Sequence, residues 1–348
     1  MKNNFWQTLS KPIIGLSPMD GITDAAYRYI VDKYGEPGVL FTEFVTVEGL
    51  AAGATRLMPI LAKHNSKTPI VAQLVGSTPD AFYQSTIIAA ALGFSGIDIN
   101  MGCPDKKVMQ NKAGAALISN PILTAQIIES VKRACVDWSN GIALIDAGLH
   151  QNIIDWFAKN KSSTRIENNR KKLPISVKTR INPTRETTEN WIKFLTQCNL
   201  DALILHGRTV SQRYTGKADW NEIGHAASLN RESKMVFIGN GDIRSIQEAR
   251  EKTEKYNVDG VLIGRAALGN PWIFKGITPD SNERFKVMLE HCQKFNELTP
   301  ELHFLNLRKH LAWYCKTIPN ASCLRKKLML VENIQGIKKI LANSIFLD

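Results

Sequence analysis

Short runs of β-branched and other apolar residues recur along the first 263 residues, and each is followed by a turn or cap residue. Eight such runs lie at 13–16, 39–41, 70–75, 96–99, 175–178, 202–205, 236–238 and 261–263. Between most of them the apolar positions follow helical spacing, for example at 80–92, 122–134, 186–197 and 245–255. This alternation predicts parallel βα units. Eight units within about 260 residues favour a closed (β/α)8 TIM barrel of the α/β class. An open doubly wound sheet is the alternative, but no Gly-x-Gly-x-x-Gly turn follows the first run.

Beyond Phe274 the strand pattern stops, and only helical spacing remains. Helices are predicted at 284–297, 300–317, 322–331 and 334–343. We therefore expect a barrel domain over residues 1–278, followed by a small α-helical domain over residues 283–348.

The second of these helices carries an apolar face and a basic face. Leu307, Leu311, Tyr314 and Ile318 share the apolar face, with spacings of 4, 3 and 4 residues. The other face holds Lys309, Trp313 and Lys316, and Arg325, Lys326 and Lys327 begin the next helix. Basic side chains beside an aromatic ring suit a phosphate backbone. The alternative is that Trp313 belongs to the core and the lysines form a solvated surface.

One connection in the predicted barrel is much longer than the others. The segment 137–172 lies between the strands at 96–99 and 175–178 and contains a short predicted helix at 149–157. A polar, basic run follows at 159–172. Long loops are either functional or disordered, and the few apolar anchors predict a mobile, solvated insertion. An RNA-contacting arm is the sharper alternative.

Composition narrows the class of protein. The chain has 348 residues, 44% of them hydrophobic, which suits a globular protein with a sizeable core. The chain contains no run of eighteen apolar residues, so no membrane span is predicted. Its first residues lack the apolar region of an export signal, so export is not expected. The six cysteines include no Cys-x-x-Cys pair, which argues against a disulfide framework or a sulfur-rich metal site and favours the cytoplasm. The net charge of +12 indicates a polyanionic partner.

Polar residues gather where the predicted strands end, which is where TIM barrels place catalytic groups. These strand-end residues are Pro18, Met19, Gln73, Asn100, Cys103, Lys178, His206, Arg208, Asn240, Gly241, Gly264 and Arg265. No set of histidines and carboxylates has metal-binding spacing, so no metal site is predicted.

Cys103 stands on a Gly-Cys-Pro turn just past the strand at 96–99. A thiol on such a turn is held rigidly at the end of the sheet. The alternative is an ordinary buried cysteine, because free cysteine is among the most buried residue types.

The loops after the seventh and eighth strands favour a phosphate. Gly239–Asp242 and Gly264–Arg265 supply backbone N–H groups and a forked cation. Together with Lys178 and Gln73 at the barrel mouth, a phosphate there suits FMN, because charge and hydrogen bonds near the ring tune a flavin.

Several motifs together make a family recognisable. They lie at 17–24 (SPMDGITD), 73–76 (QLVG), 96–104 (GIDINMGCP), 176–180 (SVKTR), 205–209 (LHGRT), 240–243 (NGDI), 263–265 (IGR) and 307–314 (LRKHLAWY). In these motifs, and over nearly its whole length, the chain resembles the tRNA-dihydrouridine synthases. It departs from them at Asp20, where a small residue is common, and in the long 137–172 insertion.

The resemblance implies a mechanism: NADPH reduces FMN, a hydride passes to C6 of a uracil in tRNA, and Cys103 gives a proton to C5. Asn100 and Arg208 would hold the uracil, and Lys309, Lys316 and Arg325 would contact the RNA. The implied FMN contacts are Pro18, Met19, Asp20, Gln73, Lys178, His206, Asn240, Gly241, Asp242, Gly264 and Arg265. A monomer is expected.

Three other functions stay open on the sequence. A dihydroorotate-type flavin enzyme acting on a free pyrimidine would share the phosphate site and the cysteine, although it would need no basic helical domain. Dihydrouridine could also be formed in an RNA other than tRNA. A nonenzymatic RNA-binding protein on a degenerate barrel is the third, and it is opposed by the presence together of Cys103, Lys178, His206 and Arg265.

Overall fold

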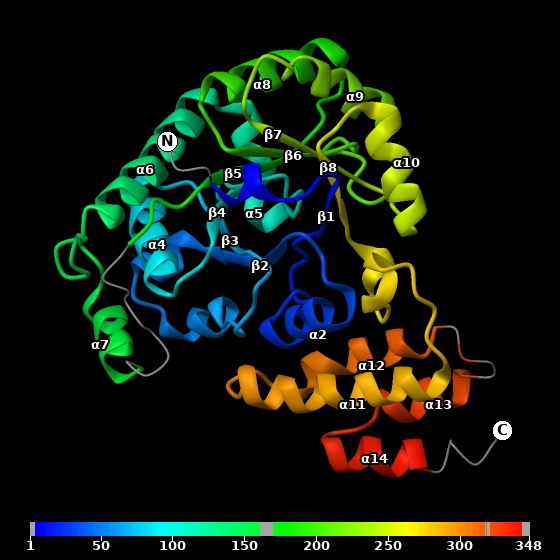
Figure 1. Cartoon of the computed structure of the whole chain (residues 1–348). Helices are drawn as coiled ribbons and strands as arrows, with labels where there is room; N and C mark the ends of the chain where they lie inside the picture. Colours follow the sequence, from blue (N-terminus) through cyan, green and yellow to red (C-terminus); the bar gives the residue numbers. More distant parts are fainter. Residues whose placement is uncertain (1–3, 161–169, 317, 319–320, 343–348) are drawn as a thin grey trace.

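The computed structural model describes residues 4–160, 170–316, 318 and 321–342 (Figure 1). Its centre is an eight-stranded sheet in which all paired neighbours are parallel, in the order β1-β8-β7-β6-β5-β4-β3-β2. The strands are β1 (Ile13–Leu16), β2 (Leu40–Thr46), β3 (Ile70–Val75), β4 (Gly96–Met101), β5 (Ile175–Arg180), β6 (Ala202–His206), β7 (Val236–Asn240) and β8 (Gly260–Ile263). Backbone N–H groups of Leu16 and Gly38 donate to Val39 and Ile14, at 3.0 and 2.8 Å, so the chain around β1 and β2 closes the sheet. The predicted TIM barrel is confirmed.

Helices surround the outside of the barrel (Figure 1). The α-helices before the C-terminal part are α1 (Phe5–Thr8), α2 (Ala25–Gly35), α3 (Val47–Ala51), α4 (Pro79–Ala91), α5 (Lys106–Gln110), α6 (Pro121–Ser139), α7 (Gln151–Lys159), α8 (Arg185–Gln197), α9 (Trp220–Ser228) and α10 (Ile246–Tyr256). Short 3-10 helices are η1 (Thr55–Leu61), η2 (Gly114–Ser119), η3 (Arg265–Ala267) and η4 (Pro271–Phe274). Within the described ranges, no helix has the length and apolar character needed to span a bilayer.

The core has two layers. Inside the barrel, residues such as Phe41, Val71, Ile204 and Ile238 pack together, and Trp6 from α1 joins them. A larger cluster fills the space between the strands and the outer helices. The packed interior fixes the strand ends, and therefore the side chains that these ends carry.

β2 extends well beyond the predicted run at 39–41. Thr42 and Glu43 interrupt the apolar pattern, yet both are buried, and the pairing with β3 shifts register between Phe41 and Phe44. The hydroxyl oxygen of Thr42 accepts the backbone N–H of Gln73 at 2.9 Å. The prediction relied on apolar residues and ended at residue 41, whereas β2 continues because polar residues such as Thr42 bond to β3.

The C-terminal part is helical, as predicted, and lies beside α2 (Figure 1). It consists of α11 (Ser281–Leu298), η5 (Phe304–Leu307), α12 (Arg308–Tyr314), α13 (Ser322–Leu328) and α14 (Ile334–Ala342). The single helix predicted at 300–317 is wrong in length, because the chain first makes the 3-10 turn η5, capped by His303. Ala26, Ile30 and Trp272 belong to the same apolar cluster as this helical domain, so its core is shared with the barrel.

The long insertion begins after α6 and contains α7, close to the predicted helix at 149–157. Most of the basic run 159–172 lies outside the described residues, and the RNA-arm interpretation falls there. Where the described chain resumes, the Arg170 guanidinium lies 4.1 Å from the centre of the Trp138 ring and donates to the carbonyl of Ile142 at 2.5 Å. This cation is therefore used to fix the end of the insertion to α6.

Candidate active site

A cavity of about 1480 Å³ opens at the carboxyl ends of the strands. All eleven residues predicted to contact the cofactor line it, together with Asn100, Cys103 and Arg208. The structure therefore brings together side chains that the sequence spreads from residue 18 to residue 265. Lys309, Lys316 and Arg325 are not among the lining residues.

Cys103 is held on its turn from both sides. The side-chain oxygen of Asn100 accepts the backbone N–H groups of Gly102 and Cys103, at 3.1 and 2.9 Å. The Cys103 carbonyl accepts the N–H of Ala115 at 3.0 Å. Burial raises the pKa of the half-buried Cys103 thiol above its usual value of 9. The thiol therefore keeps its proton at neutral pH, as a proton donor must.

Asp98 is a buried carboxylate that the sequence interpretation gave no role. Its two oxygens accept hydrogen bonds from the Gln73 side-chain amide and the Ser176 hydroxyl, both at 2.7 Å. Gln73 in turn accepts a hydrogen bond from the Asn100 amide at 2.9 Å. Burial raises the Asp98 pKa to about 6, against the hydrogen bonds from Ser176 and Gln73. An acid within the apolar run 96–99 was the sequence signal that could have revealed this residue.

Lys178 and His206 both line the cavity, and burial acts on both. Burial, together with the charge of Arg180, lowers the pKa of Lys178 to about 8. Burial and the nearby cations lower the pKa of His206, so its ring is neutral at pH 7. Its Nε2 lies 3.3 Å from Nη1 of Arg208, which can only donate. The His206 proton is therefore on Nδ1, where it serves as a hydrogen-bond donor.

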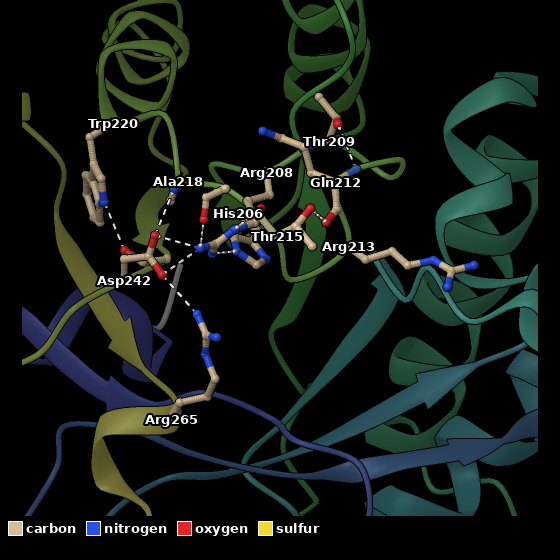
Figure 2. Close-up of polar contacts among 12 residues, drawn as sticks. His206, Arg208, Thr209, Gln212, Arg213, Thr215, Ala218, Trp220, Asp242 and Arg265 are labelled. Atoms are coloured by element: carbon tan, nitrogen blue, oxygen red, sulfur yellow. Dashed lines mark hydrogen bonds and ion pairs between the residues drawn. The ribbon is translucent and has the colours of Figure 1, made fainter.

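Asp242 joins two arginines at this wall, as Figure 2 shows. Nη2 of Arg208 donates to both carboxylate oxygens, at 2.8 and 2.7 Å, and Nη2 of Arg265 donates to one of them at 2.9 Å. The backbone N–H of Ala218 adds a further bond at 2.8 Å. Burial alone would raise the Asp242 pKa, but the hydrogen bonds from Arg208 and Ala218 hold it below its usual value.

Arg208 lines the cavity and has several partners within the protein. Its side chain is only 3% exposed, and Nε and Nη2 also donate to the carbonyls of Thr215 and Gly216, at 3.1 and 2.7 Å. The protein therefore holds the guanidinium in place at the cavity, and its predicted contact with a uracil stays a prediction. No local sequence pattern marks these partners, which lie in the loop after β6 and, for Asp242, after β7.

The predicted phosphate end is built from backbone. Gly241 has a φ of +133°, and a Cβ there would lie 2.5 Å from the Cβ of Ala218, so only glycine fits without strain. Its carbonyl accepts the indole N–H of Trp220 at 2.9 Å, which fixes the orientation of this peptide. Arg265 is 58% exposed and projects over the same end of the cavity.

Arg180, on β5, is a second residue to which the sequence interpretation assigned no role. Its Nε donates to the carbonyl of Gly102 at 2.6 Å, and Nη1 donates to the carbonyls of Thr209 and Arg213, at 3.3 and 3.0 Å. One buried guanidinium therefore ties the Cys103 turn to the loop after β6. That loop presents Tyr214, which is 65% exposed, at the edge of the cavity.

The predicted RNA contacts of the helical domain separate into two groups. Lys316 and Arg325 are exposed. Lys309 instead points toward the barrel, with its Nζ 3.1 Å from the place that a Cβ on Gly21 would take. Burial raises the pKa of Asp20, Asp24 and Glu43, and the charge of Lys309 opposes part of this rise. Eight lysines and arginines line the cavity against four acids, so the cavity lining carries an excess of cations.

Glu43 makes stability depend on pH. Burial and the charge of Asp24 raise its pKa to about 7, from 4.5 in an unfolded chain. A raised pKa in the folded state stabilises the fold at low pH, and this contribution is lost as pH rises through 7. The free energy of unfolding of the native chain should fall between pH 5 and pH 8, whereas Glu43→Gln lacks this contribution. We therefore expect the free energy of unfolding of Glu43→Gln, minus that of the native chain, to be roughly 2 kcal/mol larger at pH 8 than at pH 5. Urea unfolding at both pH values measures it; a difference that stays constant with pH would contradict the assignment.

The chain is similar to known proteins over nearly its whole length. The family model described as dihydrouridine synthase matches residues 15–138 and 164–347. A probable tRNA-dihydrouridine synthase of Staphylococcus aureus (strain COL) is 30% identical over 98% of this chain and 95% of its own length. One from Synechocystis is 29% identical over 94% and 85%. Among solved structures, an Eimeria tenella DHODH in complex with ferulenol has a TM-score of 0.53 at 12% identity, covering 83% of this chain and 84% of its own, which shows a shared fold.

Proposed function

The chain belongs to the dihydrouridine synthase family, and from this premise we propose that it reduces uridines in tRNA to 5,6-dihydrouridine, with FMN in the barrel cavity and NADPH as reductant. The observation that carries the proposal is the position of the protonated Cys103 thiol on the wall of the cavity that also holds the flavin-type residues. NADPH rests on the family resemblance. The tRNA substrate is supported by the names of the relatives and by the excess of cations around the cavity.

The residues present fit FMN. Gly241 and Gly264 expose backbone at one end of the cavity, where Arg265 would pair with a phosphate. A carboxylate repels phosphate, so we propose that Asp242 acts by orienting Arg265 rather than by touching the cofactor. At the other end, Lys178, Gln73 and the Nδ1 donor of His206 would hold the polar edge of the flavin ring. Pro18, Met19 and Asp20 complete the wall of the cavity. The side-chain amide of Asn240 is fixed by its hydrogen bond to the Leu262 carbonyl at 3.0 Å.

When bound, FMN supplies the hydride that adds to C6 of the uracil ring. Cys103 gives the proton to C5, and its raised pKa keeps that proton in place until it is needed. The cation of Lys178 stabilises negative charge beside it. The Asn100 amide is positioned to contact the base, which must leave the folded RNA to reach the cavity. Arg208 orients His206 and Asp242, and the exposed Lys316 and Arg325 contact the RNA backbone.

The direct test is product formation by the purified protein. We expect FMN-loaded protein and NADPH to convert uridine in an unmodified tRNA transcript to dihydrouridine, detected by mass spectrometry of the nucleosides. Ribosomal RNA, free uracil and orotate serve as parallel substrates under the same conditions. Turnover of a free pyrimidine at least as fast as that of tRNA would replace the proposal with the small-substrate alternative.

A further inference from the structure

The Asp98 carboxylate lies inside the barrel, beneath the candidate active site. Asp98 and Asn100 are two residues apart on β4 and therefore point to the same side of the sheet. Asp98 is fully buried, and in the sheet register it stands beside Gln73 on β3 and Ser176 on β5. Its bonds go to Gln73 and Ser176 on the two neighbouring strands. Asp98 itself is not among the residues that line the cavity, but Gln73 is.

Hydrogen bonds run in one direction from this carboxylate to the catalytic turn. An ionised carboxylate only accepts, so Gln73 must turn its NH₂ group toward Asp98 and its oxygen toward Asn100. Asn100 must then turn its NH₂ group toward Gln73, which leaves its oxygen facing the N–H groups of Gly102 and Cys103. Reversing either amide would place two donors against each other. The buried acceptor at one end and the N–H groups of the turn at the other are therefore both satisfied by a single orientation of the two amides, and Asp98 decides that of Gln73.

We propose that Asp98 is a positioning residue that acts through Gln73 and Asn100 to fix the turn carrying Cys103. The inference rests on the proposed function and deepens it, because it explains how the proton donor is held in register with the base. A displacement of about 1 Å in a reacting group can cost roughly a hundredfold in rate. Three amide and carboxylate groups linked in series, all at 2.7 to 2.9 Å, provide the rigidity that such alignment needs.

Two substitutions at Asp98 distinguish the role of its hydrogen-bond acceptor from the role of its negative charge. Asp98→Ala removes the acceptor and frees the Gln73 amide to reverse, which would turn its NH₂ group against that of Asn100 and loosen the bond that supports the turn. Asp98→Asn removes the charge but can still accept from Gln73 while donating to the Ser176 hydroxyl, which can then donate to the Ile97 carbonyl, 3.4 Å away. We expect Asp98→Ala to lower kcat at least tenfold with KM for tRNA nearly unchanged, and Asp98→Asn to stay within roughly threefold of the native enzyme.

A second readout does not depend on turnover. Site-resolved mass spectrometry can follow iodoacetamide alkylation of Cys103, with the exposed Cys323 as internal reference. A loosened turn exposes the thiol, so Asp98→Ala should alkylate several-fold faster at Cys103, and Asp98→Asn at the native rate. Glu43→Ala is the matched control: it removes another buried barrel carboxylate that has no described bond to this chain of amides, and should leave the Cys103 rate unchanged.

The proposal would be overturned if Asp98→Ala kept the native alkylation rate at Cys103 and the native kcat. It would also be overturned if Asp98→Ala and Asp98→Asn lost kcat equally, because the loss would then be due to the missing charge and not to the missing acceptor. Failure of the proposed function looks different. In that case the native protein forms no dihydrouridine, while the alkylation rates still decide whether Asp98 fixes the turn.

Discussion

Cys103→Ala is expected to lower dihydrouridine formation by at least ~100-fold while leaving bound flavin in place, because a positioned general acid contributes about two to four orders of magnitude. The side chain is half-buried on the cavity wall, and alanine occupies less space without disturbing the backbone bonds of the turn. The rate is measured by mass spectrometry of tRNA nucleosides under single-turnover conditions. Flavin content is read from the visible absorbance of the purified variant.

Cys323→Ala is the control for this experiment, because Cys323 is exposed on α13 in the helical domain and no lining residue of the cavity. It should react at the native rate. A Cys103→Ala variant as fast as the control would remove Cys103 from the chemistry and leave the barrel with another proton donor. A variant that also lost its flavin would show that the cavity, rather than the acid, had been damaged.

The barrel could be predicted from the sequence because its signal is local. Most buried strands are short apolar runs followed by polar residues that line the cavity. Cys103 and Arg265 lie just past strand ends as predicted, whereas Lys178 lies within β5, two residues before its end. β2 was cut short because Thr42 and Glu43 look exposed in a one-dimensional pattern. Their burial depends on pairing with β3, which no local pattern contains.

The roles of single side chains were harder to predict, because they depend on partners far away in the chain. Arg208 is predicted from the sequence as a contact of the uracil, and the structure adds that Asp242, in the loop after β7, binds its guanidinium. Lys309 reads as part of an exposed basic face, yet it faces the acids near Gly21. In both cases the residue type and the element were evident, and the pairing was not. Distances between separate strands are what the structure adds.

Asp242→Ala is expected to destabilise the fold by about 3 kcal/mol, because it leaves the guanidinium of Arg208 buried without its counter-charge. The Arg208 side chain is 3% exposed, so water cannot replace the lost carboxylate. The carbonyls of Thr215 and Gly216 remain as acceptors, which places the expected cost at the lower end of the range for a broken buried pair. Urea unfolding at pH 7 followed by circular dichroism measures the free energy.

The matched control is Glu129→Ala, which removes the acid of an exposed ion pair with Lys132 at 2.7 Å. An exposed pair of this kind is worth less than about 1 kcal/mol, so this variant should unfold close to the native midpoint. Asp242→Asn keeps one acceptor oxygen for Arg208 and should fall between the two. If Asp242→Ala were no less stable than Glu129→Ala, the carbonyls alone would be enough to hold Arg208, and the Asp242 carboxylate would serve only to orient Arg265 toward the phosphate.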